Sequence, residues 1–242
     1  MHAVTAALKY EPGRIQGIWV ERRRHDARRR ALLTVAEQQG IAVQQADRVE
    51  LDRLSSHARH QGVLARCIVS TAARTENELP AILESAQEPA LLLVLDGVQD
   101  PHNLGACLRS AEAAGVQAVI APVDRAVGLT ATVRKVACGA AETVPFIPVS
   151  NLARTLRSLQ EQGLWLIGAA GEAEKTLYEM DFTAPVAIIL GAEEKGLRRL
   201  TREICDNLAR IPMAGQVESL NVSVAAGVFL FEAVRQRFTT RP

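Results

Sequence analysis

The sequence predicts an α/β protein built from two domains. From residue 90 onward, short apolar runs alternate with stretches whose apolar residues recur at helical spacing. This alternation is typical of a mainly parallel sheet covered by helices. Residues 1–70 alternate in the same way, and a stretch rich in Ala, Glu, Ser, Thr and Pro follows them. The predicted organisation is therefore a small domain at 1–70, a linker at 71–89 and a larger domain at 90–242.

The smaller domain is expected to contain three strands and one helix. Apolar runs predict strands at 15–20, 41–45 and 63–69, and helical spacing predicts a helix at 26–38. Gly40 and Gly62 separate these segments, because glycine is favoured in turns. The linker is expected to hold at most one short helix.

The larger domain begins with the apolar run 90–95, a predicted buried strand. The elements that follow are expected at 104–114, 117–121, 129–138, 152–162, 164–169 and 186–190. The last helix, at 221–238, has apolar residues on nearly every face, which predicts burial all round, by the sheet on one side and by a partner subunit on the other. The sequence thus predicts a homodimer, with Arg235 and Arg237 complementing the dipole at the end of this helix.

The composition excludes several classes of protein. Hydrophobic residues make up 48% and charged residues 23%, as in soluble globular proteins. No apolar run reaches the roughly 18–20 residues needed to span a bilayer. The first residues lack the basic and then apolar pattern of a secretory signal. We therefore expect a cytoplasmic protein with no membrane contact.

The cysteines and histidines do not predict a metal site. The four cysteines, at 67, 107, 138 and 205, are too far apart for a CxxC motif. Reduced and mostly packed thiols are expected, as in the cytoplasm. His57 and His60 have a spacing that suits a metal, but no nearby Cys or His completes a ligand set.

The positive charge is concentrated in the smaller domain. Residues 1–70 carry 12 Lys/Arg against 7 Asp/Glu, a net charge of +5, and the rest of the chain carries a net −4. Two arginine clusters, at 22–24 and 28–30, supply half of these cations. They form either a solvated helix face or a surface that binds nucleic-acid phosphates. Aromatic residues are only 4% of the chain, which disfavours a stacking platform for single strands.

Three loops in the larger domain combine polar side chains with small residues. The first loop leads from the strand at 90–95 into Asn103 and Arg109, the second contains Glu193, and the third contains Ser219 and Asn221. Loops at the carboxyl ends of strands bind ligands in α/β sheets. An amide beside a permanently charged guanidinium suits a polar substrate that carries phosphate.

Each of these loop residues also has a purely structural interpretation. Asn103 and Asn221 have the side chain of a helix N-cap, and Glu193 could simply be solvated. The glycines at 191, 196 and 215 could serve as turn residues. Three such loops on one sheet nevertheless favour a binding site.

Other chemistries find little support in the sequence. The GxGxxG dinucleotide fingerprint, the GxxxxGK[ST] phosphate loop and the GxSxG nucleophile elbow do not occur. His102 beside Asp100 suggests a general base, but the Asp-Pro-His run is equally typical of a turn.

The three loops resemble the three signature motifs of the SPOUT class of RNA ribose methyltransferases. Residues 96–106 resemble the first motif, residues 191–197 the second, and residues 211–215 with 219–226 the third. Segments 60–66 and 151–155 resemble the branch that methylates guanosine in bacterial 23S rRNA. The related tRNA branch typically lacks the additional N-terminal domain.

The resemblance implies a fold and a site. The larger domain would be a SPOUT domain with a deep trefoil knot, and the smaller one an L30e-like α/β domain that binds the RNA substrate. Two subunits would form each site, and no metal would take part. S-adenosylmethionine would be held by the segments whose central residues are Gly191, Ile211, Met213, Gly215 and Leu220.

The resemblance also assigns the polar residues. Asn103, Arg109, Glu193, Ser219 and Asn221 match the functional residues of the class. Arg109 would contact phosphate or the developing oxyanion, or accept the proton of the attacking 2′-OH. Asn103, Ser219 and Asn221 would orient the substrate and the loop, and Glu193 would position a neighbouring donor.

The function implied is methylation of a guanosine ribose 2′-OH in 23S rRNA with S-adenosylmethionine as cofactor. Two alternatives remain open from the sequence: a tRNA guanosine 2′-O-methyltransferase, and a ribosome-binding module that has kept the fold but lost turnover.

Overall fold

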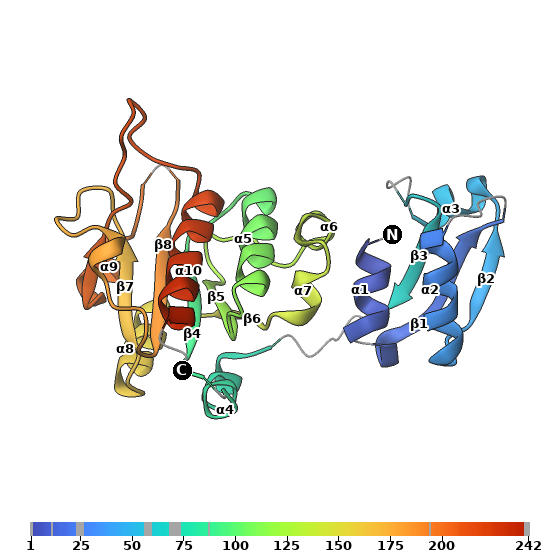
Figure 1. Ribbon diagram of the computed structural model, residues 1–242, viewed down its shortest axis with the longest axis horizontal. Helices are drawn as coiled ribbons and strands as arrows, with labels where there is room; N and C mark the ends of the chain where they lie inside the picture. Colours follow the sequence, from blue (N-terminus) through green and yellow to red (C-terminus); the bar gives the residue numbers. More distant parts are fainter. Residues whose placement is uncertain are drawn as a thin grey trace. The chain divides into compact units, whose positions relative to one another are not determined.

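The computed structural model describes residues 2–10, 12–22, 27–55, 60–67, 74–86, 88–193 and 195–239 (Figure 1). The chain divides into two compact units, Met1–Ala73 and Arg74–Pro242. Arg23, Arg24, His57 and the strand end expected at 68–69 lie outside the described residues. In the part described, no helix is long and apolar enough to cross a membrane.

The N-terminal unit is a three-stranded sheet with helices packed on it. Its elements are α1 (His2–Tyr10), η1 (Pro12–Arg14), β1 (Ile15–Glu21), α2 (Ala27–Gln38), β2 (Val43–Ala46), α3 (Arg48–Leu54) and β3 (Val63–Cys67). β1 is central, parallel to β2 and antiparallel to β3. Ile18 and Val20, two residues apart on β1, share one face of the sheet and pack with Leu8 and Leu32 in the core of the unit.

One of the predicted arginine clusters is divided by the fold of α2. Arg29 is buried, with 3% of its surface exposed, whereas Arg28 and Arg30 on the same helix are exposed. Residues one apart on a helix lie about 100° apart around its axis, so three consecutive arginines cannot share one face. The surface charge of this cluster therefore comes from two arginines rather than three.

The C-terminal unit alternates strands and helices. Its elements are η2 (Glu76–Glu78), α4 (Leu79–Glu84), β4 (Leu91–Asp96), α5 (Pro101–Ala113), β5 (Ala118–Pro122), α6 (Ala131–Ala137), α7 (Ala140–Thr143), β6 (Phe146–Val149), α8 (Leu152–Glu161), β7 (Trp165–Ala169), η3 (Leu177–Glu179), β8 (Val186–Gly191), α9 (Arg199–Ile204), β9 (Asn207–Ala209) and α10 (Val222–Thr239). The predicted α/β class with a parallel sheet is confirmed, and the trefoil knot stays a prediction.

The six strands form one parallel sheet that is covered on both faces. The order is β6-β5-β4-β8-β7-β9, and all neighbouring pairs are parallel. Every residue of β4 is buried, because its side chains alternate between two cores. Leu91, Leu93 and Leu95 pack with α5 and α10, which lie side by side against the sheet (Figure 1). Leu92 and Val94 pack with α8 on the other face.

The strand order changes direction between β4 and β8. From β4 the chain passes through α5 to β5 on one side, whereas β8 leads into α9 and β9 on the other side. Asp96 and Gly191 are the last register pair of these two neighbouring strands. Ligands of open α/β sheets bind where neighbouring strands send their chains in opposite directions.

The segment expected to be a linker is partly built into the C-terminal unit. Leu79 is 3% exposed and belongs to the core below β4, and Glu76 accepts a 2.7 Å hydrogen bond from the Thr155 hydroxyl. Residues from 74 onward therefore pack with the larger unit. Strand β6 was not predicted, because its Phe-Ile-Pro-Val run is short and contains a proline.

Helix α10 is buried on one side only within a single chain. Ala226, Phe229 and Leu230 lie in the core, but Val224 and Phe231 are about half exposed. The predicted burial all round is thus not provided by one chain.

The arginines near the end of α10 make further contacts beyond the predicted complement to the helix dipole, and Arg237 lies in the last turn as expected. Arg237 reaches away from its own helix and donates hydrogen bonds to the carbonyls of Pro89, Ala90, Phe182 and Ala184. It anchors the helix to the segments that enter β4 and β8, while Arg235 pairs with Glu232 at 2.7 Å.

Candidate functional site

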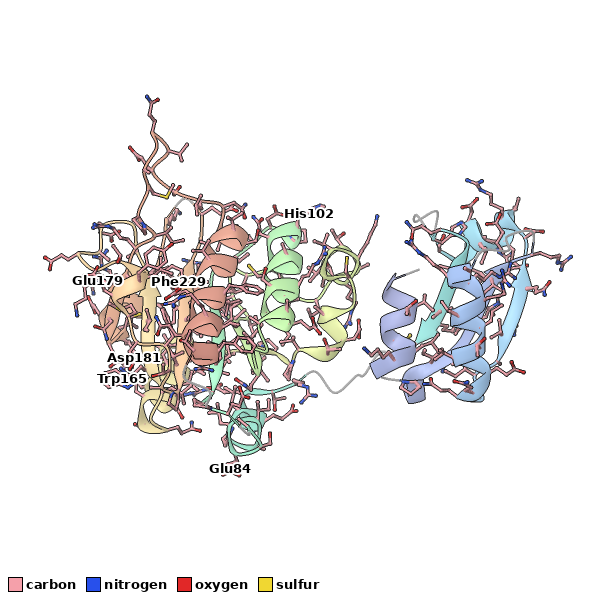
Figure 2. The ribbon with its side chains drawn as sticks, viewed as in Figure 1. Glu84, His102, Trp165, Glu179, Asp181 and Phe229 are labelled. Atoms are coloured by element: carbon pink, nitrogen blue, oxygen red, sulfur yellow. The ribbon has the colours of Figure 1, made fainter. Side chains whose placement is uncertain are left out.

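The three predicted loops meet at the carboxyl edge of the six-stranded sheet. In Figure 2, His102 in the first turn of α5 marks this edge, and Trp165 at the start of β7 marks the opposite one. Because the strands are parallel, the chain leaves each of them at this same edge. Three segments therefore lie there: the loop after β4, the loop after β8 and the segment between β9 and α10.

A hydrogen-bonded cluster joins one side chain from each loop. The Glu193 carboxylate accepts from the Asn103 amide and, at 2.8 Å, from the Asn221 amide. The same Asn221 amide nitrogen donates to Asn103 Oδ1 at 3.0 Å. Each member therefore contacts the other two, and we call these three residues the loop cluster. Glu193 is not simply solvated, since two amides hold its carboxylate.

The helix starts position two members of the loop cluster. Asp100 caps α5, with Oδ1 accepting from the His102 amide at 2.8 Å, so the N-cap interpretation of Asn103 is wrong. Asn103 lies one turn further on and is 8% exposed. Asn221 both caps a helix and belongs to the loop cluster. Its Oδ1 accepts from the Ser223 backbone N–H at 2.9 Å at the start of α10, while its side-chain NH2 group donates within the cluster.

A buried ion pair ties the loop after β8 to the end of β4. Asp96 is fully buried and accepts from the Arg198 backbone N–H at 3.0 Å and from its guanidinium at 2.5 Å. This pair anchors the end of the loop that carries Glu193 to the end of β4. Sequence reasoning did not assign Asp96 a role, although a carboxylate ending an otherwise apolar strand was the available signal.

A cavity of about 150 Å³ lies beside the loop cluster. Four of the five residues expected to hold a cofactor line it, namely Gly191, Ile211, Met213 and Leu220, whereas Gly215 does not. Glu193 and Ser219 line it as well. A Cβ on Gly191 would lie 2.0 Å from the Gly196 carbonyl carbon, so only glycine allows the two backbones to approach this closely.

The chemistry of this cavity fits S-adenosylmethionine. Apolar side chains such as Leu220 and Phe229 can cover an adenine ring, and the small residues 169–171 leave backbone groups accessible. Glu193 and Glu218 add carboxylates that suit a ligand carrying a sulfonium and an ammonium group.

Arg109 is not brought together with the loop cluster in one chain. It follows Asn103 by six residues on α5, which corresponds to roughly 9 Å along the helix and to a different face. Its side chain is exposed, and Nη1 lies 4.0 Å from the Cys138 sulfur near the end of α6. Among the described residues, Arg109 lines neither this cavity nor the cavity that adjoins it.

Two of the four cysteines, Cys107 and Cys205, have thiols that are held protonated. Burial, followed by the nearby Glu193 charge, raises the pKa of the Cys107 thiol to about 12, and burial raises the pKa of Cys205 likewise to about 12. Both remain protonated at neutral pH and are poor nucleophiles. The expectation of mostly packed thiols is only half correct, because Cys67 and Cys138 are exposed.

The described residues contain no group of three or more potential metal ligands. His60, one of the two histidines considered from the sequence, instead contacts Asp52 at 2.9 Å.

The fold and the loop cluster define an α/β domain with a ligand site at the carboxyl edge of its sheet. The model of the SpoU rRNA Methylase family matches residues 90–231, and that of the RNA 2′-O ribose methyltransferase substrate-binding family matches residues 1–70. The chain therefore belongs to the SpoU rRNA methylase family, and the resemblance found in the three loops is confirmed.

Curated relatives are similar over nearly the whole chain. The 23S rRNA (guanosine-2′-O-)-methyltransferase RlmB of Pseudomonas aeruginosa is 56% identical over 98% of this chain and 95% of its own length. The RlmB of Escherichia coli K12 is 55% identical over 98% of this chain and 97% of its own length.

Solved structures share the fold. The SpoU methyltransferase AviRb of Streptomyces viridochromogenes, in complex with AdoMet, is 24% identical with a TM-score of 0.77, over 98% of this chain and 89% of that one. An RNA 2′-O ribose methyltransferase is 27% identical with a TM-score of 0.78, over 98% and 87%.

Proposed function

We propose that this protein methylates the ribose 2′-OH of a guanosine in 23S rRNA, with S-adenosylmethionine as methyl donor. The observation that carries the proposal is the loop cluster of Asn103, Glu193 and Asn221 beside the glycine-lined cavity. Relatives that are 55–57% identical over nearly their full length are named for this reaction, which supports the same substrate class here. Such a reaction would take place in the cytoplasm of a bacterium.

The cavity would hold the cofactor through Gly191, Ile211, Met213 and Leu220, and we assign Gly215 a place in the loop that borders it. S-adenosylmethionine supplies a methyl group already activated by its sulfonium. The chain must therefore orient donor and acceptor, and positioning alone can contribute roughly 7–11 kcal/mol.

The loop cluster and Ser219 would orient the acceptor. Glu193 fixes both amides, so Asn103 and Asn221 present a rigid polar surface to the ribose. When the cofactor is bound, the 2′-oxygen would take the methyl carbon from the sulfonium, which would leave as a neutral thioether, and the hydroxyl proton would pass to water. A preorganised donor aimed at this oxygen stabilises the developing charge.

We assign Arg109 to the site of a partner subunit. The residue is exposed and turned away from the loop cluster of its own chain, while α10 leaves an apolar face with Val224 and Phe231 exposed. A homodimer covering this face would bring Arg109 of one protomer to the other's site. There its permanent charge would contact phosphate or the developing oxyanion.

Mixing two inactive variants tests this assignment. Arg109→Ala and Glu193→Gln homodimers should each be inactive, and co-refolded mixtures should regain activity, because one of the two sites in a heterodimer is intact. Continued inactivity of a mixture that contains heterodimers would show that Arg109 acts within its own chain.

The N-terminal unit would dock the RNA. We assign residues 1–70 to RNA binding and residues 90–242 to the methyltransferase domain, in line with the two family matches, whereas the expected linker at 71–89 packs with the larger unit from residue 74 onward. Arg22, Arg28 and Arg30 are exposed on the N-terminal unit and would meet phosphates.

Methyl transfer from labelled S-adenosylmethionine tests the whole proposal. Label should enter 23S rRNA lacking its natural ribose methylation, and mapping should place it on a guanosine 2′-oxygen. Label entering only tRNA would favour a tRNA methyltransferase. RNA binding without transfer would indicate a silent ribosome-binding module.

A further inference from the structure

A second cavity of about 360 Å³ adjoins the cofactor cavity. The two share Ala192, Glu193 and Val222, so Glu193 of the loop cluster borders both cavities. The second cavity is otherwise lined by the loop after β4, by Asn103 on α5 and by Lys195 from the loop after β8. Its volume falls within the range of about 300–1,000 Å³ usual for small-molecule sites.

We propose that this second cavity binds the base of the target nucleotide and that Asp100 makes it selective for guanine. The inference rests on the proposed methyltransferase function and adds to it the residue that reads the base. It gives a second role to a carboxylate that the structure otherwise uses only as the cap of α5.

The position of the cavity follows from the geometry of methyl transfer. The attacking oxygen must lie about 3–3.5 Å from the carbon it attacks. The nucleotide must therefore occupy space that directly adjoins the cofactor cavity. Among the described residues, the second cavity meets this condition through the wall formed by Glu193 and Val222.

The polar lining suits guanine rather than adenine. Guanine presents two adjacent donors on its Watson–Crick edge, the ring N1–H and the exocyclic amine, and a carboxylate accepts from both. Adenine presents an acceptor at the ring position, which a carboxylate repels. Lys195 supplies a cation that suits the neighbouring phosphate.

Asp100 is held in place while retaining capacity for a ligand. Its Oδ1 caps α5 through the His102 amide, and an ionised carboxylate has further lone pairs available. Two hydrogen bonds fix the loop that carries Asp100 to the loop after β5. The backbone N–H of Val127 donates to the Val98 carbonyl at 3.0 Å. The side-chain amide of Gln99 donates to the Arg125 carbonyl at 3.3 Å. A rigid wall of this kind favours discrimination between bases.

A variant that keeps the helix cap isolates the recognition role. Asp100→Ser preserves the cap of α5, because serine caps as well as aspartate, but its hydroxyl is too short to reach the base. Asp100→Asn also preserves the cap and replaces one acceptor oxygen with a donor. Asp124→Asn, an exposed carboxylate after β5 that lines neither cavity, is the matched control.

The experiment measures kcat/KM for each full-length variant on 23S rRNA fragments with guanosine or inosine at the mapped site. Inosine lacks only the exocyclic amine. For the wild type and Asp124→Asn, kcat/KM should be about tenfold lower on the inosine RNA than on the guanosine RNA. For Asp100→Ser and Asp100→Asn, kcat/KM on the guanosine RNA should be about tenfold lower than that of the wild type. Their kcat/KM on the inosine RNA should equal their value on the guanosine RNA. Cofactor affinity and the thermal midpoint should stay near wild type.

Two results would overturn the inference. If the Asp100 variants lose as much on inosine as the wild type does, Asp100 does not contact the amine. If the wild type methylates both RNAs equally, guanine is not read through this amine. Absence of transfer by the wild type to guanosine RNA is a different outcome, because it would refute the proposed function itself.

Discussion

Asn221 uses both ends of its carboxamide, and this dual use links stability to function. The oxygen caps α10 through Ser223, while the nitrogen donates to Glu193 and Asn103. Loss of the side chain would therefore affect the start of a helix and the geometry of the loop cluster together. The two effects can be separated, because other small polar residues also cap helices.

Asn221→Ser should keep the fold and lose activity. Serine replaces the cap, so the thermal midpoint should stay close to that of the wild type. The loop cluster loses its shared donor, and methyl transfer should fall about tenfold or more. Asn221→Ala should lose both, with an added cost of about 1 kcal/mol in unfolding free energy. Unchanged activity of the serine variant would contradict the role of the amide.

The Asp96–Arg198 pair should show an asymmetry between its partners. Asp96 is fully buried, whereas the Arg198 side chain is 44% exposed. Arg198→Met leaves a buried carboxylate without its guanidinium and should cost about 3 kcal/mol in urea unfolding. Asp96→Asn should cost less, because the amide oxygen still accepts from the Arg198 backbone and the guanidinium can turn to water.

Arg199→Met is the control for this comparison. Arg199 is 91% exposed and pairs with Glu203 at 3.5 Å, so its loss should cost at most about 1 kcal/mol. Equal costs at positions 198 and 199 would argue against the buried pair as the closure of this loop.

Among the helices and strands of the C-terminal unit, α10 carries three large exposed apolar side chains, Val224, Phe231 and Phe238. Its inner face packs Phe229 edge-on against Phe182 at 6.5 Å between ring centres, and Phe229 lies within the unit in Figure 2. Its other face exposes Val224, Phe231 and Phe238, at 51%, 49% and 62%. An apolar stripe of this kind is rare on a monomer and favours the proposed homodimer interface.

Phe231→Glu should disrupt the proposed homodimer. A carboxylate at the centre of an apolar interface cannot be desolvated cheaply, so association should weaken strongly. Analytical ultracentrifugation at micromolar concentration should give a dimer for the wild type and a monomer for the variant. Leu200→Glu, at an exposed apolar residue of α9, should remain dimeric. A monomeric wild type would refute the proposal.

Taken as a complete molecule, the chain consists of two compact units with different charge. The N-terminal unit has its own core around Ile18 and Leu32, and the C-terminal unit has the cores on both faces of its sheet. The excess of positive charge lies in residues 1–70. This separation suggests that RNA docking and methyl transfer can be impaired independently.

Reversing the exposed charges of the N-terminal unit should weaken RNA binding. The full-length variant Arg22→Glu/Arg28→Glu/Arg30→Glu should bind 23S rRNA more weakly. Its log–log salt slope should be lower by about 0.7–0.9 for each phosphate that is no longer neutralised. Filter binding at several salt concentrations measures both quantities. Cofactor affinity should be unchanged, and Arg157→Glu on α8 serves as the control. An unaltered slope would mean that these arginines only solvate α2 and its surroundings.

Local patterns in the sequence were sufficient to predict the class of fold, the order of most elements and the three loops that form the site. These features depend on periodicity and on short motifs, which are fully present in the chain. The contacts within the site depend instead on tertiary packing, since Asn103 and Asn221 meet across 118 positions. The burial of Arg29, the Asp96–Arg198 pair and the separation of Arg109 from the loop cluster likewise depend on which faces of distant elements meet. Packing sets those distances, and no local pattern encodes them.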